Sequence, residues 1–220
     1  MERSTLEILF EELLKKPEDL EFFLGLHYGF NEFQGKTVAA FYEAALWPGL
    51  KARIDEGHQK PSRPPLALKP APHSRLTDLK GDWLCLSRPG WPERLAVALG
   101  SEQYNTRLIY VQIVVKGEKG SPAQKRFEER RPSLLEKVKK QFPGQKVECN
   151  HSAVWFFYDG ASPYRSWDTE KSLTMLAEEL LAVKGRERPG PEGSLSGRYI
   201  DDLMALVEIV DGTEWIQGAP

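Results

Sequence analysis

Hydrophobic residues recur at three- and four-residue spacings in the first 57 residues, and this period is typical of amphipathic helices. In the opening segment, Leu6, Leu9 and Leu13 fall on one helical stripe. The same spacing predicts later helices over residues 124–142, 167–181 and 198–210. Pro132 weakens the first of these because proline has no backbone N–H to donate, so two short helices that meet near Arg131 are an alternative to one long helix.

From Gly81 onward the hydrophobic period changes to two, which predicts β-strands. The expected strands cover residues 83–86, 94–99, 106–115, 146–150 and 153–158. The turns between the first three strands are short, and short connections favour antiparallel pairing. Helices occur in blocks instead of alternating with strands, so the pattern predicts an α+β fold. We expect an antiparallel sheet of about five strands covered on one face by helices, with a helical segment at the N-terminus.

Prolines crowd between these two parts of the chain, and five of the sixteen lie between Pro61 and Pro72. A segment this rich in proline is extended and is neither a helix nor a central strand. We interpret it as a strap or linker, and the alternative is a ligand for the aromatic groove of a partner. The predicted division is an N-terminal helical segment over 1–57, the proline-rich strap over 58–80 and an α+β domain over 81–220.

Composition narrows the class of protein. The 220 residues are 40% hydrophobic and 28% charged, which provides enough apolar material for a core, and the net charge is −2. No uncharged apolar run reaches the roughly 18 residues of a membrane span, and the first residues lack the apolar stretch of a signal peptide. Cys85 and Cys149 are too few for a disulfide framework, so we expect a cytoplasmic protein without membrane association.

One stretch departs from this near-neutral balance, because residues 116–146 carry ten basic and four acidic residues. A basic cluster next to a glycine-containing turn favours binding of a polyanion or of an acidic protein partner. It is equally typical of the solvated face of an amphipathic helix. The candidate binding residues are Lys116, Lys119, Lys125, Arg126, Arg130, Arg131, Lys139 and Lys140.

A second candidate contact site follows the last predicted strand. Tyr164, Arg165 and Trp167 belong to an aromatic loop, and exposed tyrosine and tryptophan beside arginine are typical anchors of protein interfaces. Signals for catalysis are weaker. Cys149 and His151 lack the ligand spacing of a zinc site, and the chain contains no phosphate-binding or dinucleotide-binding glycine motif. The sequence therefore predicts no catalytic residue, no metal ligand and no cofactor.

Two stretches resemble proteins of bacterial defence that belong to the PD-(D/E)XK nuclease superfamily. The opening from Ser4 to Leu24 is similar to their N-terminal helices. The block from Trp83 to Trp167 is similar to the antiparallel, helix-covered domain that follows the nuclease core in many of them. The family's catalytic Asp and Glu-x-Lys have no counterpart in this sequence. The resemblance therefore implies an accessory sensing or binding role without nuclease activity.

Taken together, these observations favour a non-catalytic protein–protein interaction module, and the resemblance adds a role as a sensor or inhibitor in bacteria–phage conflict. The first alternative is a nucleic-acid-binding module that uses the basic 116–146 stretch, which predicts steeply salt-dependent binding. The second alternative is a degenerate metal-dependent nuclease, for which Asp78 and Asp82 are the nearest candidate residues.

Overall fold

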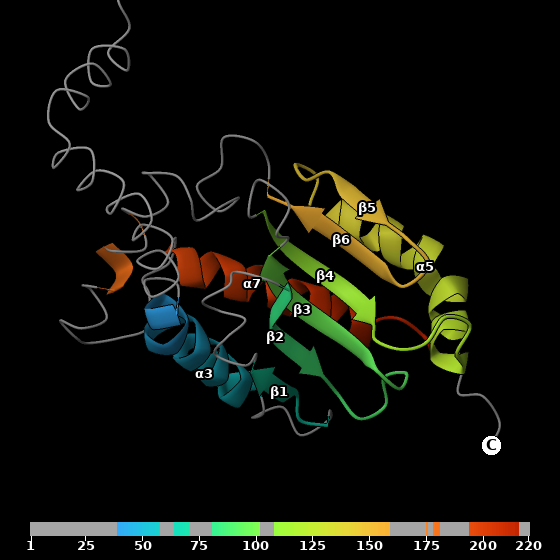
Figure 1. The fold of residues 1–220 in the computed structure, drawn as a ribbon, viewed down its shortest axis with the longest axis horizontal. Helices are drawn as coiled ribbons and strands as arrows, with labels where there is room; N and C mark the ends of the chain where they lie inside the picture. Colours follow the sequence, from blue (N-terminus) through green and yellow to red (C-terminus); the bar gives the residue numbers. More distant parts are fainter. Residues whose placement is uncertain are drawn as a thin grey trace, which may run out of the picture.

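The computed structural model describes residues 39–57, 64–70, 81–101, 108–158, 175, 178–180 and 194–215. The helices predicted before residue 39 and most of the helix predicted over 167–181 lie outside these residues. In the part that is described, one antiparallel sheet packs against helices (Figure 1), which confirms the predicted α+β class.

The sheet has six strands in the order β1-β2-β3-β4-β6-β5, and every neighbouring pair is antiparallel. The first four strands form a meander, and the β5–β6 hairpin returns after helix α5 to pair with β4. The strands are β1 (Ala67–Pro70), β2 (Gly81–Ser87), β3 (Leu95–Ser101), β4 (Ile109–Val115), β5 (Val147–Cys149) and β6 (Ala153–Phe157).

The sequence predicted five of the six strands. The one that it did not predict is β1, which comes from the proline-rich segment. β1 pairs only with β2 among the described strands and therefore lies at the edge of the sheet. An edge strand tolerates proline because one of its sides makes no ladder hydrogen bonds, and Pro70 ends this strand. The described part of this segment over residues 67–70 is extended, as predicted, and forms a strand of the sheet.

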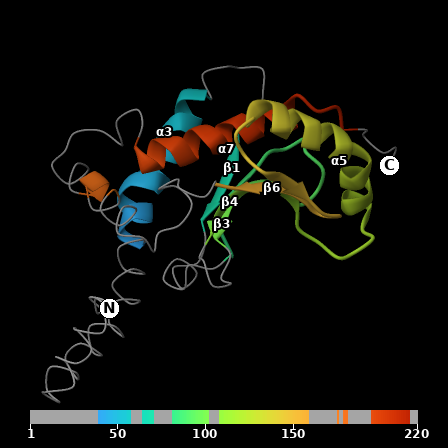
Figure 2. The ribbon, with the colours of Figure 1, turned by 90° about the horizontal axis from the view of Figure 1, so that it is seen from above.

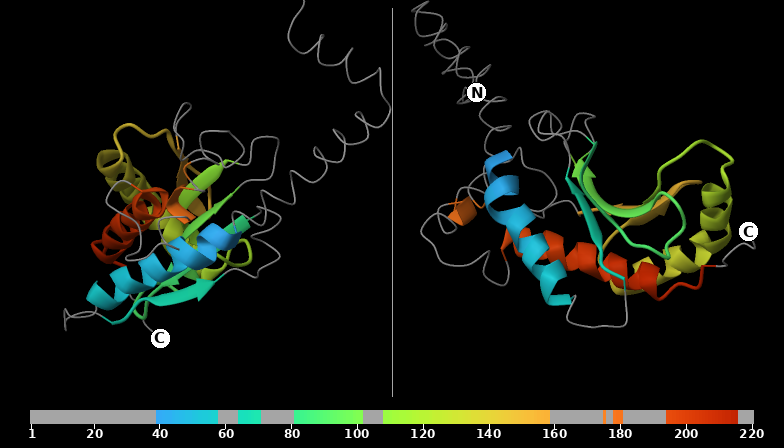
Figure 3. Two further views of the ribbon diagram at one scale, coloured as in Figure 1. Left: turned by 90° about the vertical axis from the view of Figure 1, so that its left-hand side faces the viewer. Right: turned by 90° about the horizontal axis from the view of Figure 1, so that it is seen from below.

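The helices gather on one side of the sheet (Figures 2 and 3). Helix α7 packs against β3 and β4, α5 packs against β4, β5 and β6, and α3 packs against α7. These helices are α3 (Trp47–Gly57), which follows the π-helix η1 (Tyr42–Leu46), α5 (Pro122–Gln141) and α7 (Leu195–Asp211). No helix of the described ranges is long and apolar enough to cross a membrane.

Helix α5 runs without a break through Pro132, so the alternative of two separate helices meeting near Arg131 is wrong. The ribbon bends along this helix, and its two arms point in different directions (Figures 2 and 3). A proline inside a helix removes one backbone hydrogen bond and kinks the chain, which explains the bend. The bent helix contacts both the β5 edge of the sheet and α7.

Alternation along the strands separates an inner face, covered by α5 and α7, from an outer face. In β4, Val111 and Ile113 are buried, and the residues that alternate with them, Tyr110, Gln112 and Val114, are half-buried. Cross-strand register carries this alternation across the sheet. The inner row of Leu84, Leu99, Val111 and Phe156 is part of the core, and the outer row consists of Cys85, Ala98, Gln112 and Trp155.

Candidate functional site

A pocket of about 920 Å³ lies over β1, β2 and β3 beside the β2–β3 turn. Its lining combines apolar residues with charged ones: the apolar ones include Ala67, Trp91 and Ala96, and the charged ones are Lys69, Asp82, Arg88, Glu93, Arg94 and Lys116. Ligand pockets in proteins typically measure 300–1,000 Å³ and pair an apolar wall with a few polar groups. The size and lining of this pocket fit that description.

Asp82 is the centre of the polar network at the pocket. Its Oδ1 accepts hydrogen bonds from Tyr110 Oη at 3.0 Å and from Gln112 Nε2 at 2.8 Å. Its Oδ2 lies 2.7 Å from Lys116 Nζ, which also contacts Cys85 Sγ at 2.8 Å. The Asp82 side chain is only 13% exposed, so these donors replace most of the water that would otherwise solvate its charge.

A β-bulge in β2 brings Asp82 and Cys85 to the same face. Asp82 pairs with Gly100 and Leu84 with Leu99, so Trp83 is an additional residue on β2. Without the bulge, residues three positions apart in a strand would point to opposite faces. The bulge thus places both the carboxylate and the thiol on the outer face, within reach of Lys116.

Gly100 leaves the room that this network needs. A Cβ at position 100 would lie 2.6 Å from Tyr110 Oη and 2.4 Å from the carbonyl oxygen of Gly81. The phenol of Tyr110 therefore occupies the space where any other residue would place a side chain, and this position lets it reach Asp82.

Burial and neighbouring charges act on the pKa values of Cys85 and Lys116. Burial raises the pKa of the Cys85 thiol, and the hydrogen bond from Lys116 only partly offsets this effect. For Lys116, burial alone would lower the pKa, but hydrogen bonds to Asp82 and Cys85 and the Asp82 charge outweigh it, so the pKa is raised. At neutral pH the site therefore holds a neutral thiol and a charged ammonium group.

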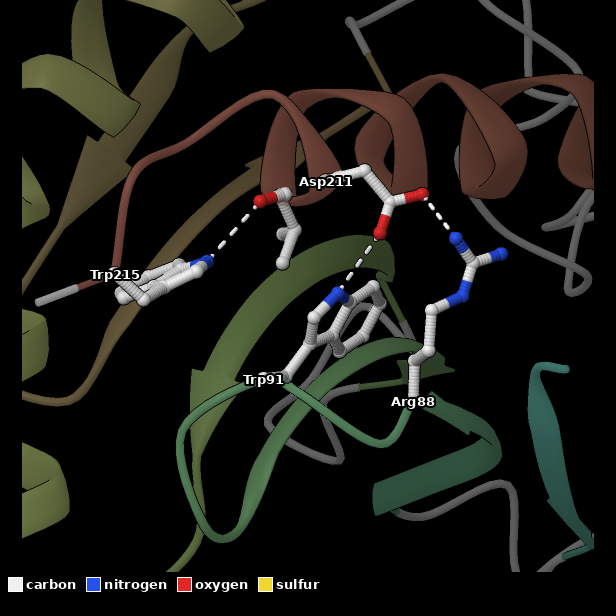
Figure 4. Close-up of polar contacts among 5 residues, drawn as sticks. Arg88, Trp91, Asp211 and Trp215 are labelled. Atoms are coloured by element: carbon white, nitrogen blue, oxygen red, sulfur yellow. Dashed lines mark hydrogen bonds and ion pairs between the residues drawn. The ribbon is translucent and has the colours of Figure 1, made fainter. Parts of the chain in front are cut away.

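The wall of the pocket beside the β2–β3 turn is fixed to the end of α7. Arg88 Nη1 lies 2.5 Å from Asp211 Oδ2, and Trp91 Nε1 donates to Asp211 Oδ1 at 2.9 Å (Figure 4). On the other side of this helix end, Trp215 Nε1 donates to the carbonyl oxygen of Val210 at 3.1 Å (Figure 4). Because a buried carboxylate holds both turn residues, the turn is a rigid part of the site.

Arg94 adds a second cation next to Lys116. Its backbone carbonyl accepts a hydrogen bond from the Lys116 N–H at 3.0 Å, directly beyond the pair formed by Leu95 and Val115. Arg94 has a φ of 63°, the left-handed conformation that disfavours residues with a Cβ. The position thus carries a local cost, because an arginine occupies a left-handed backbone conformation.

Three aromatic residues and one glutamine lie together on the outer face over β4 and β6, and we call them the aromatic surface: Tyr110, Gln112, Trp155 and Phe157. Gln112 stands opposite Trp155 and Tyr110 opposite Phe157 in the ladder. The rings of Tyr110 and Phe157 meet edge to face at a centroid distance of 6.2 Å. These four residues are half-buried, and none of them lines the pocket.

The predicted basic residues lie at two places in the fold. Lys116 lies at the pocket and pairs with Asp82, whereas the others lie on α5 or on the turn before it. On the helix, Arg131 donates to the carbonyl oxygen of Asn150 at 3.1 Å, and Lys139 pairs with Glu136 at 3.3 Å. Five cations of the set are exposed and three are half-buried: the exposed ones are Lys116, Lys119, Lys125, Lys139 and Lys140, and the half-buried ones are Arg126, Arg130 and Arg131.

The predicted contact loop of Tyr164, Arg165 and Trp167 lies outside the described residues, as does Asp78. Among the residues that are described, no three His, Cys, Asp or Glu side chains are grouped so that they could hold a metal ion. Sequence reasoning did not identify Arg94, Tyr110 or Gln112 as parts of a site. The consecutive aromatic residues from Trp155 to Tyr158 are the sequence signal for the rest of the aromatic surface, because alternation places Trp155 and Phe157 on one face.

Comparisons with known proteins add little. No protein-family model matches the chain, and no curated protein matches its sequence. A crystal structure described as a "putative oxidoreductase" from Parabacteroides merdae ATCC 43184 aligns with 60% of this chain and 29% of its own chain, at 12% identity and a TM-score of 0.24. A likeness this low carries no argument. The resemblance to PD-(D/E)XK defence proteins and the role in bacteria–phage conflict stay predictions.

Proposed function

We propose that this chain is a non-catalytic protein-binding module that contacts its partner through the aromatic surface on the outer face of the sheet. The observation that carries the proposal is the composition of that surface. It joins three half-buried aromatic side chains with one amide and contains no charge. The centres of protein interfaces are enriched in Tyr, Trp and Phe and depleted in charged residues.

The contacts that hold these side chains in place also favour binding. Tyr110 is held by its hydrogen bond to Asp82 and by its contact with Phe157, and Gln112 is held by the same carboxylate. Side chains that are already fixed lose little conformational entropy when a partner binds. The partner that fits is a protein with an apolar or aromatic segment, because the surface offers ring faces and edges in place of charges.

The protonation states at the pocket favour binding over catalysis. A catalytic cysteine reacts as a thiolate and therefore needs a lowered pKa, whereas burial raises the pKa of Cys85. A nucleophilic lysine needs a neutral amine, whereas the contacts of Lys116 keep it charged. The proposal includes a reducing, cytoplasmic setting, which suits the two free thiols Cys85 and Cys149.

Photo-crosslinking in cells tests the proposal. The photoreactive amino acid p-benzoylphenylalanine replaces Trp155 in one variant and Glu208, an exposed residue of α7, in the matched control. We expect a crosslinked protein of defined mass from position 155 that survives nuclease treatment, and none from position 208. Equal products from both positions, or no product at 155, would overturn the proposal.

The partner identified in this way then allows a quantitative test. Trp155→Ala should weaken its binding at least tenfold, because aromatic anchors carry much of the energy of an interface. Glu208→Ala should leave the affinity unchanged. A crosslink at position 155 that disappears with nuclease would instead support the nucleic-acid alternative and count against a protein partner.

A further inference from the structure

We propose that the pocket over β1, β2 and β3 is a second binding site, which takes an amphipathic organic anion: a carboxylate, phosphate or sulfonate joined to an apolar body. This site goes beyond the protein-binding function proposed above and shares no residue with the aromatic surface. The argument rests on the charges that line the pocket, on the conformation of Arg94 and on the apolar part of the wall.

Cations outnumber carboxylates in the lining of the pocket. Four cations line it, Lys69, Arg88, Arg94 and Lys116, against the two carboxylates of Asp82 and Glu93. The Glu93 side chain is 84% exposed and lies 3.6 Å from Arg94, so water screens most of its charge. The neighbouring Cys85 adds no negative charge because its thiol stays protonated.

Three of the four cations are accessible to a ligand. The Arg88 side chain is 11% exposed and is held by Asp211, so it belongs to the wall. Lys69 is exposed on β1 opposite Cys85, whose sulfur contacts Lys116. Side chains of Lys116 and Arg94 remain 45% and 57% exposed. An acidic group in the pocket would meet ammonium and guanidinium donors from three separate segments of the chain.

The backbone at Arg94 indicates that its side chain has a use beyond folding. A left-handed φ costs a residue with a Cβ of order 1 kcal/mol relative to glycine, and Arg94 has a φ of 63°. Local costs of this kind persist where the residue contributes to a site. Arg94 and Lys116 both line the pocket, so a bound anion could accept from either side chain.

The ligand also needs an apolar body. Ala67, Pro92 and Ala96 line the pocket beside the cations, and the volume of about 920 Å³ is far larger than a bare inorganic anion requires. A free phosphate would leave this wall in contact with water. The chemistry that matches both parts of the lining is an organic acid whose charged end meets the cations and whose apolar end covers the alanine side.

Two fluorescent probes that differ in one charged group test this assignment: 8-anilinonaphthalene-1-sulfonate and its uncharged counterpart N-phenyl-1-naphthylamine. We expect the sulfonate to bind the purified full-length chain at least tenfold more tightly. Arg94→Gly should weaken the binding of the sulfonate about tenfold, because one charge-assisted contact is lost, and should leave the affinity for the neutral probe unchanged. Arg94→Lys should keep most of the affinity, and Lys140→Gln on α5 is the matched control that should change nothing.

The stability of Arg94→Gly separates lost binding from lost folding. Glycine accepts the left-handed φ, so this variant should unfold at the same temperature as the natural chain or a higher one. Equal affinity for the two probes, or unchanged sulfonate binding in both Arg94→Gly and Lys69→Gln, would overturn the proposal. Complete displacement of the sulfonate by millimolar inorganic phosphate would overturn the amphipathic part of it. Trp155→Ala should leave probe binding intact, so a failure here is distinct from a failure of the protein-binding function.

Discussion

Asp211 at the end of α7 forms an ion pair with Arg88, 123 residues earlier in the chain, at a distance of 2.5 Å. Their side chains are 7% and 11% exposed, and the same carboxylate accepts a hydrogen bond from Trp91. The pair joins the last described helix to the β2–β3 turn and so fixes one wall of the pocket. The contribution of this buried pair to the free energy of unfolding can be compared with that of an exposed ion pair on the same helix.

We expect Asp211→Asn to lower the free energy of unfolding by about 3 kcal/mol, because it leaves the buried guanidinium of Arg88 without a matching charge. Asp201→Asn, which breaks a pair with Arg53 whose side chains are 53% and 66% exposed, should cost at most about 1 kcal/mol. Urea unfolding curves followed by tryptophan fluorescence provide both values. A similar loss of unfolding free energy in the two variants would show that the burial of the Arg88–Asp211 pair does not add to its contribution to stability.

Gly100 offers a steric test of the polar network. Gly100→Ala should destabilise the fold by about 1–3 kcal/mol, since the new methyl group would meet the Gly81 carbonyl and the Tyr110 hydroxyl. At Gly144 a methyl group would have nothing within 4 Å of it, so Gly144→Ala should change stability by less than about 0.5 kcal/mol. Thermal unfolding measures the difference. A neutral Gly100→Ala variant would contradict the close approach of Tyr110.

The two thiols should differ in their reactivity. Iodoacetamide reacts with the thiolate, and burial raises the pKa of Cys85, whereas Cys149 is exposed. At pH 8 we expect Cys149 to be alkylated several-fold faster, as measured by mass spectrometry of the peptides. Asp82→Asn should speed the reaction of Cys85 because the Asp82 charge raises the thiol's pKa, and Lys116→Met should slow it because the lysine lowers that pKa. Changes in the same direction would contradict this assignment of charges.

Asp202 predicts a pH dependence of stability. Burial raises its pKa, and hydrogen bonds from Tyr158 Oη at 2.8 Å and Arg198 Nε at 3.0 Å only partly offset this effect. The folded chain therefore holds the proton more tightly than the unfolded chain. As the pH rises above about 4, where an unfolded aspartate ionises, the protein should lose stability until Asp202 has ionised in the folded state as well.

The variant Asp202→Asn isolates this contribution, because its amide oxygen can still accept from Tyr158 and does not titrate. The stability of the natural chain minus that of the variant should fall as the pH rises through this window, in urea unfolding series at closely spaced pH values. A difference that stays constant or rises with pH would mean that the pKa of Asp202 is not raised in the folded protein.

Much of the fold could be predicted because it follows from periodicities that are local in the chain. Alternation in Ile109–Val115 identifies a strand with one buried face, and the three- and four-residue spacing of Ile200, Leu203 and Val207 identifies a helix. The short turn from Arg88 to Arg94 implies antiparallel pairing of its two strands. The α+β class, five of the six strands and both long helices of the described part follow from such patterns.

The site could not be predicted in the same way, because its residues meet through register and bulges. Alternation alone puts Asp82 and Cys85 on opposite faces, and only the extra residue in β2 brings both beside Lys116. The basic stretch suggested that Lys116 acts together with the cations of α5. The chain instead turns after β4, so Lys116 stays on the sheet and pairs with Asp82.

The same distinction explains the edge strand β1. Its prolines mark an extended segment in the sequence, but whether an extended segment joins a sheet depends on a partner strand with free backbone groups, here β2. Hydrophobic period, turn residues and caps act over a few positions, and the sequence therefore settles the elements and their class. The contacts between Asp211 and Arg88 and between Asp82 and Lys116 join residues far apart in the chain. They form only when the strands have paired in one register and α7 has packed against the sheet.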